Sequence, residues 1–154
     1  RFFNVYGNKS NAVVAKFIAQ YLQNKEITIY GSGNQSRDFI HVDDIIQIVS
    51  LLLVKNIKSN LFNVGSSKNT TIKKIKDLID PKWKSVNLAK RFDDIEKSIS
   101  NNNKIKKVLN WSPKIDFKIG IKKMINEDHI RLKKIKLPSI PSQKKLIKKF
   151  NSQK

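Results

Sequence analysis

The stretch ITIYGSGNQSRDFIHVDD, from Ile27 to Asp44, decides how the chain folds. It contains, one after the other, a β-branched strand, a turn with Gly31 and Gly33, an arginine and a second strand. A dinucleotide-binding loop has the pattern G-x-G-x-x-G and leads directly into a helix, whose amino end holds the pyrophosphate. Here Ser36 stands at the third glycine position, and the strand-like run DFIHV follows. We therefore interpret the two glycines as turn residues.

Arg37 follows this turn at the edge of the second strand. A guanidinium group binds phosphate oxygens in a bidentate manner, so Arg37 is a candidate ligand contact. Composition alone favours the alternative, a surface arginine paired with Asp38, Asp43 or Asp44. We interpret Asp43 and Asp44 as the start of a helix rather than as acid–base residues, because acidic side chains suit the positive end of a helix.

Strands and helices alternate along the chain, which predicts an α/β fold. Apolar spacing predicts the helices, and short β-branched runs predict the strands. The predicted strands are 1–6, 27–30, 38–42, 61–64 and 86–88. The predicted helices are 12–22, 43–54, 71–79, 103–109 and 117–130. Residues 131–154 hold nine basic residues and no acidic one, so we expect a basic, mobile tail after a folded unit of residues 1–130.

The charge of the chain is strongly positive, at +20 from 32 basic and 12 acidic residues. Nearly all of the excess is lysine, scattered among many isoleucines and asparagines, and only four arginines are present. This pattern is typical of a compositional bias, so it does not favour nucleic-acid binding, although the surface attracts anionic ligands. There is no cysteine, no recognisable signal peptide and no apolar run of the roughly 18 residues that span a bilayer. We expect a cytoplasmic protein that does not contact a membrane.

Four motifs occur in order and together carry a family resemblance: RFFNVYG at 1–7, ITIYGSGNQSRDFIHVDDI at 27–45, LFNVGSSKNTTI at 61–72 and LNWSPKIDFKIGI at 109–121. Over about residues 1–127 the sequence resembles the carboxy-terminal part of the NAD-dependent epimerase/dehydratase family, the extended short-chain dehydrogenase/reductases. Within this family it looks most like the UDP-glucose 4-epimerase-like nucleotide-sugar enzymes. The resemblance implies the last core strands of a Rossmann-type fold together with a small α/β substrate-binding domain.

The resemblance also implies a substrate-binding role for five residues. Asn4 and Arg37 match residues that contact the diphosphate of the nucleotide sugar. Tyr30 ends the segment that packs beside the base. Arg91 matches an arginine near the ribose and phosphate, and Asp94 matches the acidic residue that holds the ribose hydroxyls. The family motif R-x-G-D reads R-F-D-D here, so a strained residue or a different loop is expected at Asp93.

On the cofactor side, the resemblance implies that Phe2 and Phe3 lie beside the nicotinamide of NAD. The family binds NAD mainly through its amino-terminal half, which also carries a catalytic Tyr-x-x-x-Lys pair. Tyr21 and Lys25 fit that spacing literally, but Tyr21 lies on an apolar helix face, where core packing explains it. We therefore expect no catalytic residue in this chain. The two histidines stand alone, and no metal site is expected.

The resemblance thus predicts the nucleotide-sugar-binding half of an NAD-dependent epimerase or dehydratase. The nearest members of the family imply that the ligand is a UDP-sugar. The chain is expected to be a fragment, a split gene product or a sequence truncated at the amino end, and to be inactive without an amino-terminal NAD-binding part. The complete enzyme is expected to form a homodimer. The rival hypothesis is a non-catalytic module whose basic surface binds polyanions or nucleic acid.

Overall fold

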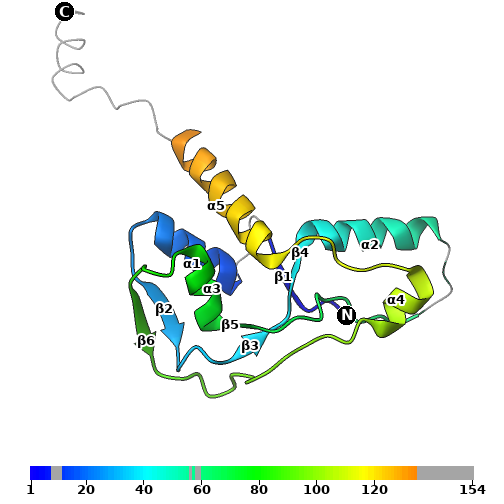
Figure 1. The fold of residues 1–154 in the computed structure, drawn as a ribbon, viewed down its shortest axis with the longest axis horizontal. Helices are drawn as coiled ribbons and strands as arrows, with labels where there is room; N and C mark the ends of the chain where they lie inside the picture. Colours follow the sequence, from blue (N-terminus) through cyan, green and yellow to red (C-terminus); the bar gives the residue numbers. More distant parts are fainter. Residues whose placement is uncertain (8–11, 56, 58–59, 135–154) are drawn as a thin grey trace, which may run out of the picture.

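The computed structural model describes residues 1–7, 12–55, 57 and 60–134, and the expected tail is described only as far as residue 134. Strands and helices alternate over this part of the chain (Figure 1). Its strands are β1 (Asn4–Tyr6), β2 (Ile27–Tyr30), β3 (Ser36–Arg37), β4 (Phe39–His41), β5 (Thr70–Thr71) and β6 (Ser85–Leu88). Its helices are α1 (Val13–Leu22), α2 (Val42–Val54), α3 (Ile72–Ile79), α4 (Asn103–Leu109) and α5 (Phe117–Lys134).

The strands of the described residues pair in twos. β1 runs parallel to β4, and β2 runs parallel to β6 with Tyr30 opposite Leu88. The short β3 and β5 pair antiparallel in the middle of the molecule (Figure 1). Phe2 forms a single parallel bridge to Val64, so the predicted strand 61–64 contributes one bridge rather than a ladder. The sequence predicts β2, β4 and β6 within one residue at each end, whereas β1 begins at Asn4 rather than Arg1, and β3 and β5 are not predicted.

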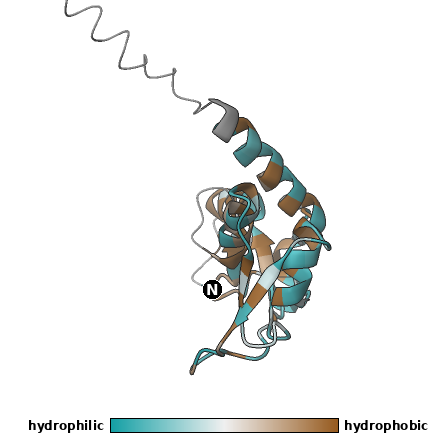
Figure 2. Ribbon diagram, turned by 90° about the vertical axis from the view of Figure 1, so that its left-hand side faces the viewer, coloured by the Kyte–Doolittle hydropathy of each residue, from teal (hydrophilic) through white to brown (hydrophobic). Residues whose placement is uncertain are grey.

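Two hydrophobic clusters hold these elements. The first lies between α1, α3 and α5 and the strand β2, and its fully buried members include Ile18, Ile27 and Ile75. The second lies beneath α2 and α4, where Ile48 and Ile105 are fully buried. Figure 2 shows α5 leaving the body of the molecule towards its carboxyl end. The β1–β4 pair lies between the two clusters, because Tyr6 and Phe39 belong to the first and Ile40 belongs to the second.

The helix ends follow local side-chain chemistry. His41 rather than Asp43 caps α2, because its Nδ1 accepts a hydrogen bond from the Asp43 backbone N–H at 3.1 Å. The hydroxyl of Thr71 caps α3 by accepting from the N–H of Lys74 at 3.1 Å. Asn110 ends α4 in the left-handed conformation. The last helix, α5, continues to Lys134, past the predicted end at residue 130.

Helix α2 is apolar on two faces. One face, with Ile45 and Ile48, is buried in the second cluster. A second stripe of Ile46, Val49 and Leu53 is exposed to solvent. These three residues follow the i, i+3, i+7 spacing of one helix face, so they form a continuous apolar strip.

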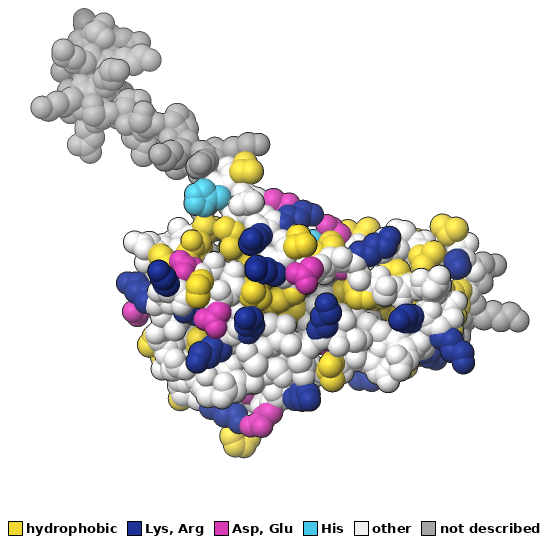
Figure 3. Space-filling view, viewed as in Figure 1, with side chains coloured by type: hydrophobic (Ala, Val, Ile, Leu, Met, Phe, Trp, Pro, Cys, Tyr) yellow, Lys and Arg dark blue, Asp and Glu magenta, His cyan; other side chains and the backbone are white. Residues whose placement is uncertain are grey.

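The charged side chains show no concentrated basic patch on the face drawn in Figure 3, where lysines and arginines are scattered among polar and apolar atoms. Among the described residues, no helix combines the length and the apolar composition needed to cross a bilayer.

Candidate functional site

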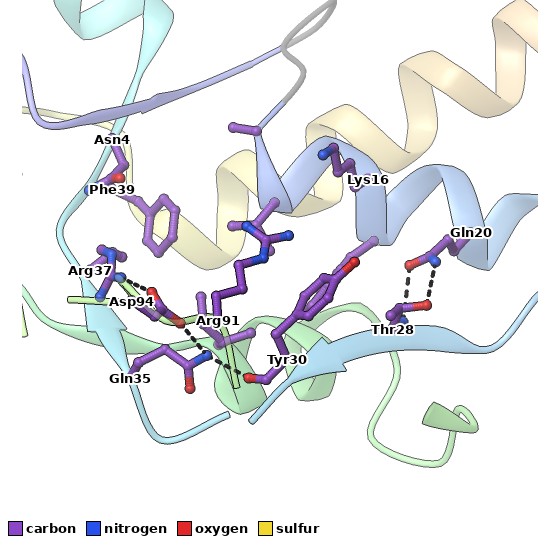
Figure 4. A pocket seen from close by; sticks show the side chains of 14 residues that line it. Asn4, Lys16, Gln20, Thr28, Tyr30, Gln35, Arg37, Phe39, Arg91 and Asp94 are labelled. Atoms are coloured by element: carbon purple, nitrogen blue, oxygen red, sulfur yellow. Dashed lines mark hydrogen bonds and ion pairs between the residues drawn. The ribbon is translucent and has the colours of Figure 1, made fainter. Parts of the chain in front are cut away.

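A cavity of about 480 Å³ lies between α1, β2 and the segment that follows β6 (Figure 4). All five residues proposed from the sequence to bind substrate line it: Asn4, Tyr30, Arg37, Arg91 and Asp94. They come from four separate parts of the chain, the farthest of them 90 positions apart in sequence. The fold therefore brings the whole predicted set together in one place.

At one end of the cavity, Arg37 forms an ion pair with Asp94, with 2.5 Å between Nη2 and Oδ1. Both side chains are largely buried, at 16% and 17% exposure. The second amino group of Arg37 donates to the backbone carbonyl of Ser36 at 2.9 Å, and Gln35 donates to the other oxygen of Asp94 at 3.0 Å. Composition favours a surface arginine that pairs with Asp38, Asp43 or Asp44. This alternative is wrong, because the ion-pair partner is Asp94. Arg37 pairs with another residue of the predicted site.

Asn4 is fixed by two hydrogen bonds to one atom. Its backbone N–H and its side-chain amide both donate to the carbonyl of Asp38, at 3.1 and 3.0 Å. One N–H of the side-chain amide is already hydrogen-bonded. The amide oxygen and the second N–H can therefore form hydrogen bonds with a ligand.

At the middle of the cavity, the guanidinium of Arg91 lies 4.0 Å from the centre of the Tyr30 ring. Stacking of this kind suits arginine, whose charge is spread over a flat group. Gln35 also donates to the carbonyl of Tyr30 at 2.7 Å, so one amide links both halves of the cavity. Of the two alternatives expected at Asp93, the strained residue does not occur, because Asp93 is not among the described residues with positive φ.

The far end of the cavity holds residues that the sequence did not single out. Gln20 of α1 and Thr28 of β2 exchange two hydrogen bonds, at 3.0 and 3.2 Å. Lys16 lies one helical turn before Gln20 and lines the same cavity. The spacing of these residues in the sequence is a signal that could have indicated them. Lys16 and Gln20 are four residues apart and share a face of α1, and Thr28 and Tyr30 are two residues apart and share a face of β2.

A second cavity of about 480 Å³ lies beside the first and shares Asn4 with it. Phe2 and Phe3, the residues predicted to lie beside NAD, both line it. Phe2 is 55% exposed, so an aromatic surface is open there. The chain contains no G-x-G-x-x-G run, the pattern that holds the pyrophosphate of a dinucleotide.

The two aspartates at the start of α2 bind other parts of the fold. Asp44 is buried and accepts from the backbone N–H groups of Lys114 and Ile115, at 2.9 and 3.2 Å. Asp43 binds the ammonium group of Lys123 at 2.8 Å, and this hydrogen bond lowers the pKa of Asp43. Burial lowers the pKa of His41, which favours the neutral, capping form.

Tyr21, which the sequence places on an apolar helix face, packs against another aromatic side chain. The ring of Tyr21 packs edge-on against Trp83, with 4.7 Å between centroids. The described residues also contain no group of three or more His, Cys, Asp or Glu side chains that could hold a metal ion.

The chain is similar in sequence to several known proteins. Residues 1–65 match the model of the NAD dependent epimerase/dehydratase family. A putative UDP-glucose 4-epimerase of Methanocaldococcus jannaschii is 31% identical, over 82% of this chain and 43% of that protein. UDP-glucuronic acid decarboxylase 1 of Arabidopsis thaliana is 31% identical, over 86% of this chain and 32% of that protein.

Among solved structures, the crystal structure of UDP-glucose 4-epimerase from Thermotoga maritima with UDP-glucose is similar, with a TM-score of 0.76 and 29% identity. The match covers 86% of this chain and 45% of that one. The chain thus spans less than half the length of these relatives. The predicted fold class, an α/β part of a Rossmann-type extended short-chain dehydrogenase/reductase, is confirmed.

Proposed function

Because the chain resembles the carboxy-terminal part of the NAD-dependent epimerase/dehydratase family, we propose that its first cavity binds a nucleotide sugar, with UDP-sugars as the leading class. The observation that carries this proposal is the single cavity that gathers Asn4, Arg37, Arg91 and Asp94 around the ring of Tyr30. The names of the similar proteins, UDP-glucose 4-epimerase and UDP-glucuronic acid decarboxylase, support UDP as the nucleotide.

The charge of the cavity suits a diphosphate. Three cationic side chains line it, Lys16, Arg37 and Arg91, against the single carboxylate of Asp94. The two hydrogen bonds of Arg37 leave further N–H groups of its guanidinium for phosphate oxygens, because the group has five donors. The ion pair with Asp94 therefore orients the guanidinium group and leaves N–H donors available for an anion.

Asp94 suits the ribose. Each of its carboxylate oxygens accepts one hydrogen bond, from Arg37 and from Gln35. A carboxylate offers about four acceptor positions, so it has room for the hydroxyl groups of a sugar diol. The flat Arg91–Tyr30 stack is the surface against which we place the base.

In a complete enzyme of this family, NAD would supply hydride transfer at the sugar. The residues of this chain would hold the nucleotide while Phe2 and Phe3 form a wall beside the cofactor. Since the catalytic tyrosine and lysine of the family have no counterpart here, we propose that this chain alone has no turnover. The complete enzyme is proposed to be a cytoplasmic homodimer.

The test is a calorimetric titration of the chain with UDP, GDP and a short oligonucleotide at 50 and 200 mM salt. We expect saturable UDP binding, and a loss of roughly tenfold to a hundredfold in affinity for Arg37→Ala, since hydrogen bonds to charged groups contribute about 1.5–3 kcal/mol. Lys90→Ala is the matched control, because Lys90 is an exposed cation of the neighbouring loop that pairs with Glu96. Tight oligonucleotide binding with a steep salt dependence and no UDP binding would favour the rival polyanion module.

A further inference from the structure

One wall of the first cavity is an irregular segment of residues 89–99, here called the strap, which runs from the end of β6 to Ser100. The strap carries Arg91 and Asp94, and most of its side chains are exposed. It has little core of its own, so hydrogen bonds must hold it against the cavity. Two backbone bonds at Ser36 do so: its N–H donates to Glu96 at 2.8 Å, and its carbonyl accepts from Ser98 at 3.1 Å.

The carboxyl end of the strap is held by Asp38, which is fully buried. Its Oδ2 accepts from both the backbone N–H and the hydroxyl of Ser100, at 2.9 and 2.6 Å, and from the N–H of Ser67 at 2.9 Å. Its Oδ1 accepts from the N–H and the hydroxyl of Ser66, both at 2.6 Å. Among the described residues no ion pair reaches Asp38, so five hydrogen bonds to neutral donors hold this buried charge.

We propose that Asp38 is a positioning residue of the nucleotide cavity, which locks the strap through Ser100 so that Asp94 faces the ribose of the ligand. The inference rests on the proposed function of the cavity. Asp38 directly follows Arg37, so two adjacent residues fix the strap from both sides: Arg37 binds Asp94 in its middle, and Asp38 binds its end. Release of the end lets Asp94 move away from the ligand although neither Asp38 nor Ser100 touches the ligand.

The two serine hydroxyls that bind Asp38 provide a matched pair of variants. Ser100→Ala removes a 2.6 Å hydrogen bond that leads to the strap, and Ser66→Ala removes a 2.6 Å hydrogen bond that leads to the segment after Val64. Both variants lose one hydroxyl from the same carboxylate, so their effects on global stability are expected to be similar. Only the first loosens the strap, which keeps the hydrogen bond from the backbone N–H of Ser100 to Asp38. If Ser100→Ala does not fold, Ser100→Cys takes its place, because a thiol is a much weaker hydrogen-bond donor than a hydroxyl group.

The decisive measurement is the ratio of affinities for UDP and 2′-deoxy-UDP in the 154-residue chain. The ratio reports on Asp94, because a general loss of stability lowers both affinities alike. We expect wild type and Ser66→Ala to prefer UDP by about tenfold. Ser100→Ala should reduce this preference to about twofold, with faster hydrogen exchange confined to residues 89–99.

Three outcomes separate the possibilities. An unchanged ratio in Ser100→Ala overturns the positioning role, and so does an equal fall of the ratio in both variants. If the wild-type chain binds neither UDP nor 2′-deoxy-UDP, the proposed function fails, and this inference fails with it.

Discussion

The ion pair between Arg37 and Asp94 is the contact on which the geometry of the site depends most, and its strength can be measured by a double-mutant cycle. The three variants are Arg37→Ala, Asp94→Ala and the combination of both. Each single variant leaves one charged side chain at about one-sixth exposure without its ionic partner. We expect both singles to be destabilised, and the double variant to be less destabilised than their sum.

The magnitude follows from the burial of the pair. Exposed ion pairs contribute about 0.2–1 kcal/mol, whereas loss of one partner of a buried pair costs about 3–5 kcal/mol. Because the two side chains are 16% and 17% exposed, we place each single variant between these limits, at about 2 kcal/mol. The expected coupling free energy is about 1–2 kcal/mol.

The assay is urea unfolding of the four proteins, with the free energy of unfolding extrapolated linearly to water. The pair between Lys90 and Glu96 is the control, since it lies on the same strap and both side chains are well exposed. Lys90→Ala should leave the free energy of unfolding unchanged within error. A coupling free energy of zero between Arg37 and Asp94, or an equal loss in Lys90→Ala, would refute the reasoning from burial.

Three further predictions concern the framework. Burial lowers the pKa of His41, so the unfolded chain binds the proton more readily than the folded chain. The free energy of unfolding should therefore be constant above about pH 6.5 and fall as the pH decreases below that value. His41→Asn should remove this pH dependence in pH-jump unfolding. Asp44→Ala should cost about 2–3 kcal/mol in urea unfolding, because two backbone N–H groups lose their acceptor. Gly33→Ala should lower the thermal midpoint, at a cost of about 1–2 kcal/mol, because φ is +75° and the new Cβ would lie 3.1 Å from a side chain of β2.

The sequence predicted the local elements well because their signals are local. The run from Ile27 to Tyr30 is bounded by turn residues, and the structure forms β2 over the same four residues. The helix predicted at 103–109 is likewise observed with those bounds. Helix α5 ends four residues after the predicted end at residue 130, because basic residues are compatible with a helix as well as with a mobile tail.

Long-range pairing could not be predicted from such signals. Nothing in the run Ser85–Leu88 marks it as the partner of β2, since all four residues are exposed and the pairing is made through backbone atoms. The same reason explains the partner of Arg37. Asp94 lies 57 positions away, whereas composition pointed to the aspartates next to Arg37 in sequence. The family resemblance named both residues, and the fold places them together.

The exposed apolar strip on α2 has a consequence for the behaviour of the chain in concentrated solution. At low ionic strength, the net charge of +20 keeps copies apart, because like charges repel over a screening distance of about 10 Å at 0.1 M salt. At 1 M salt this screening distance falls to about 3 Å. The strip of Ile46, Val49 and Leu53 can then pack against the same strip of another molecule. Salting-out should therefore occur early for so basic a protein, and Val49→Lys should delay it.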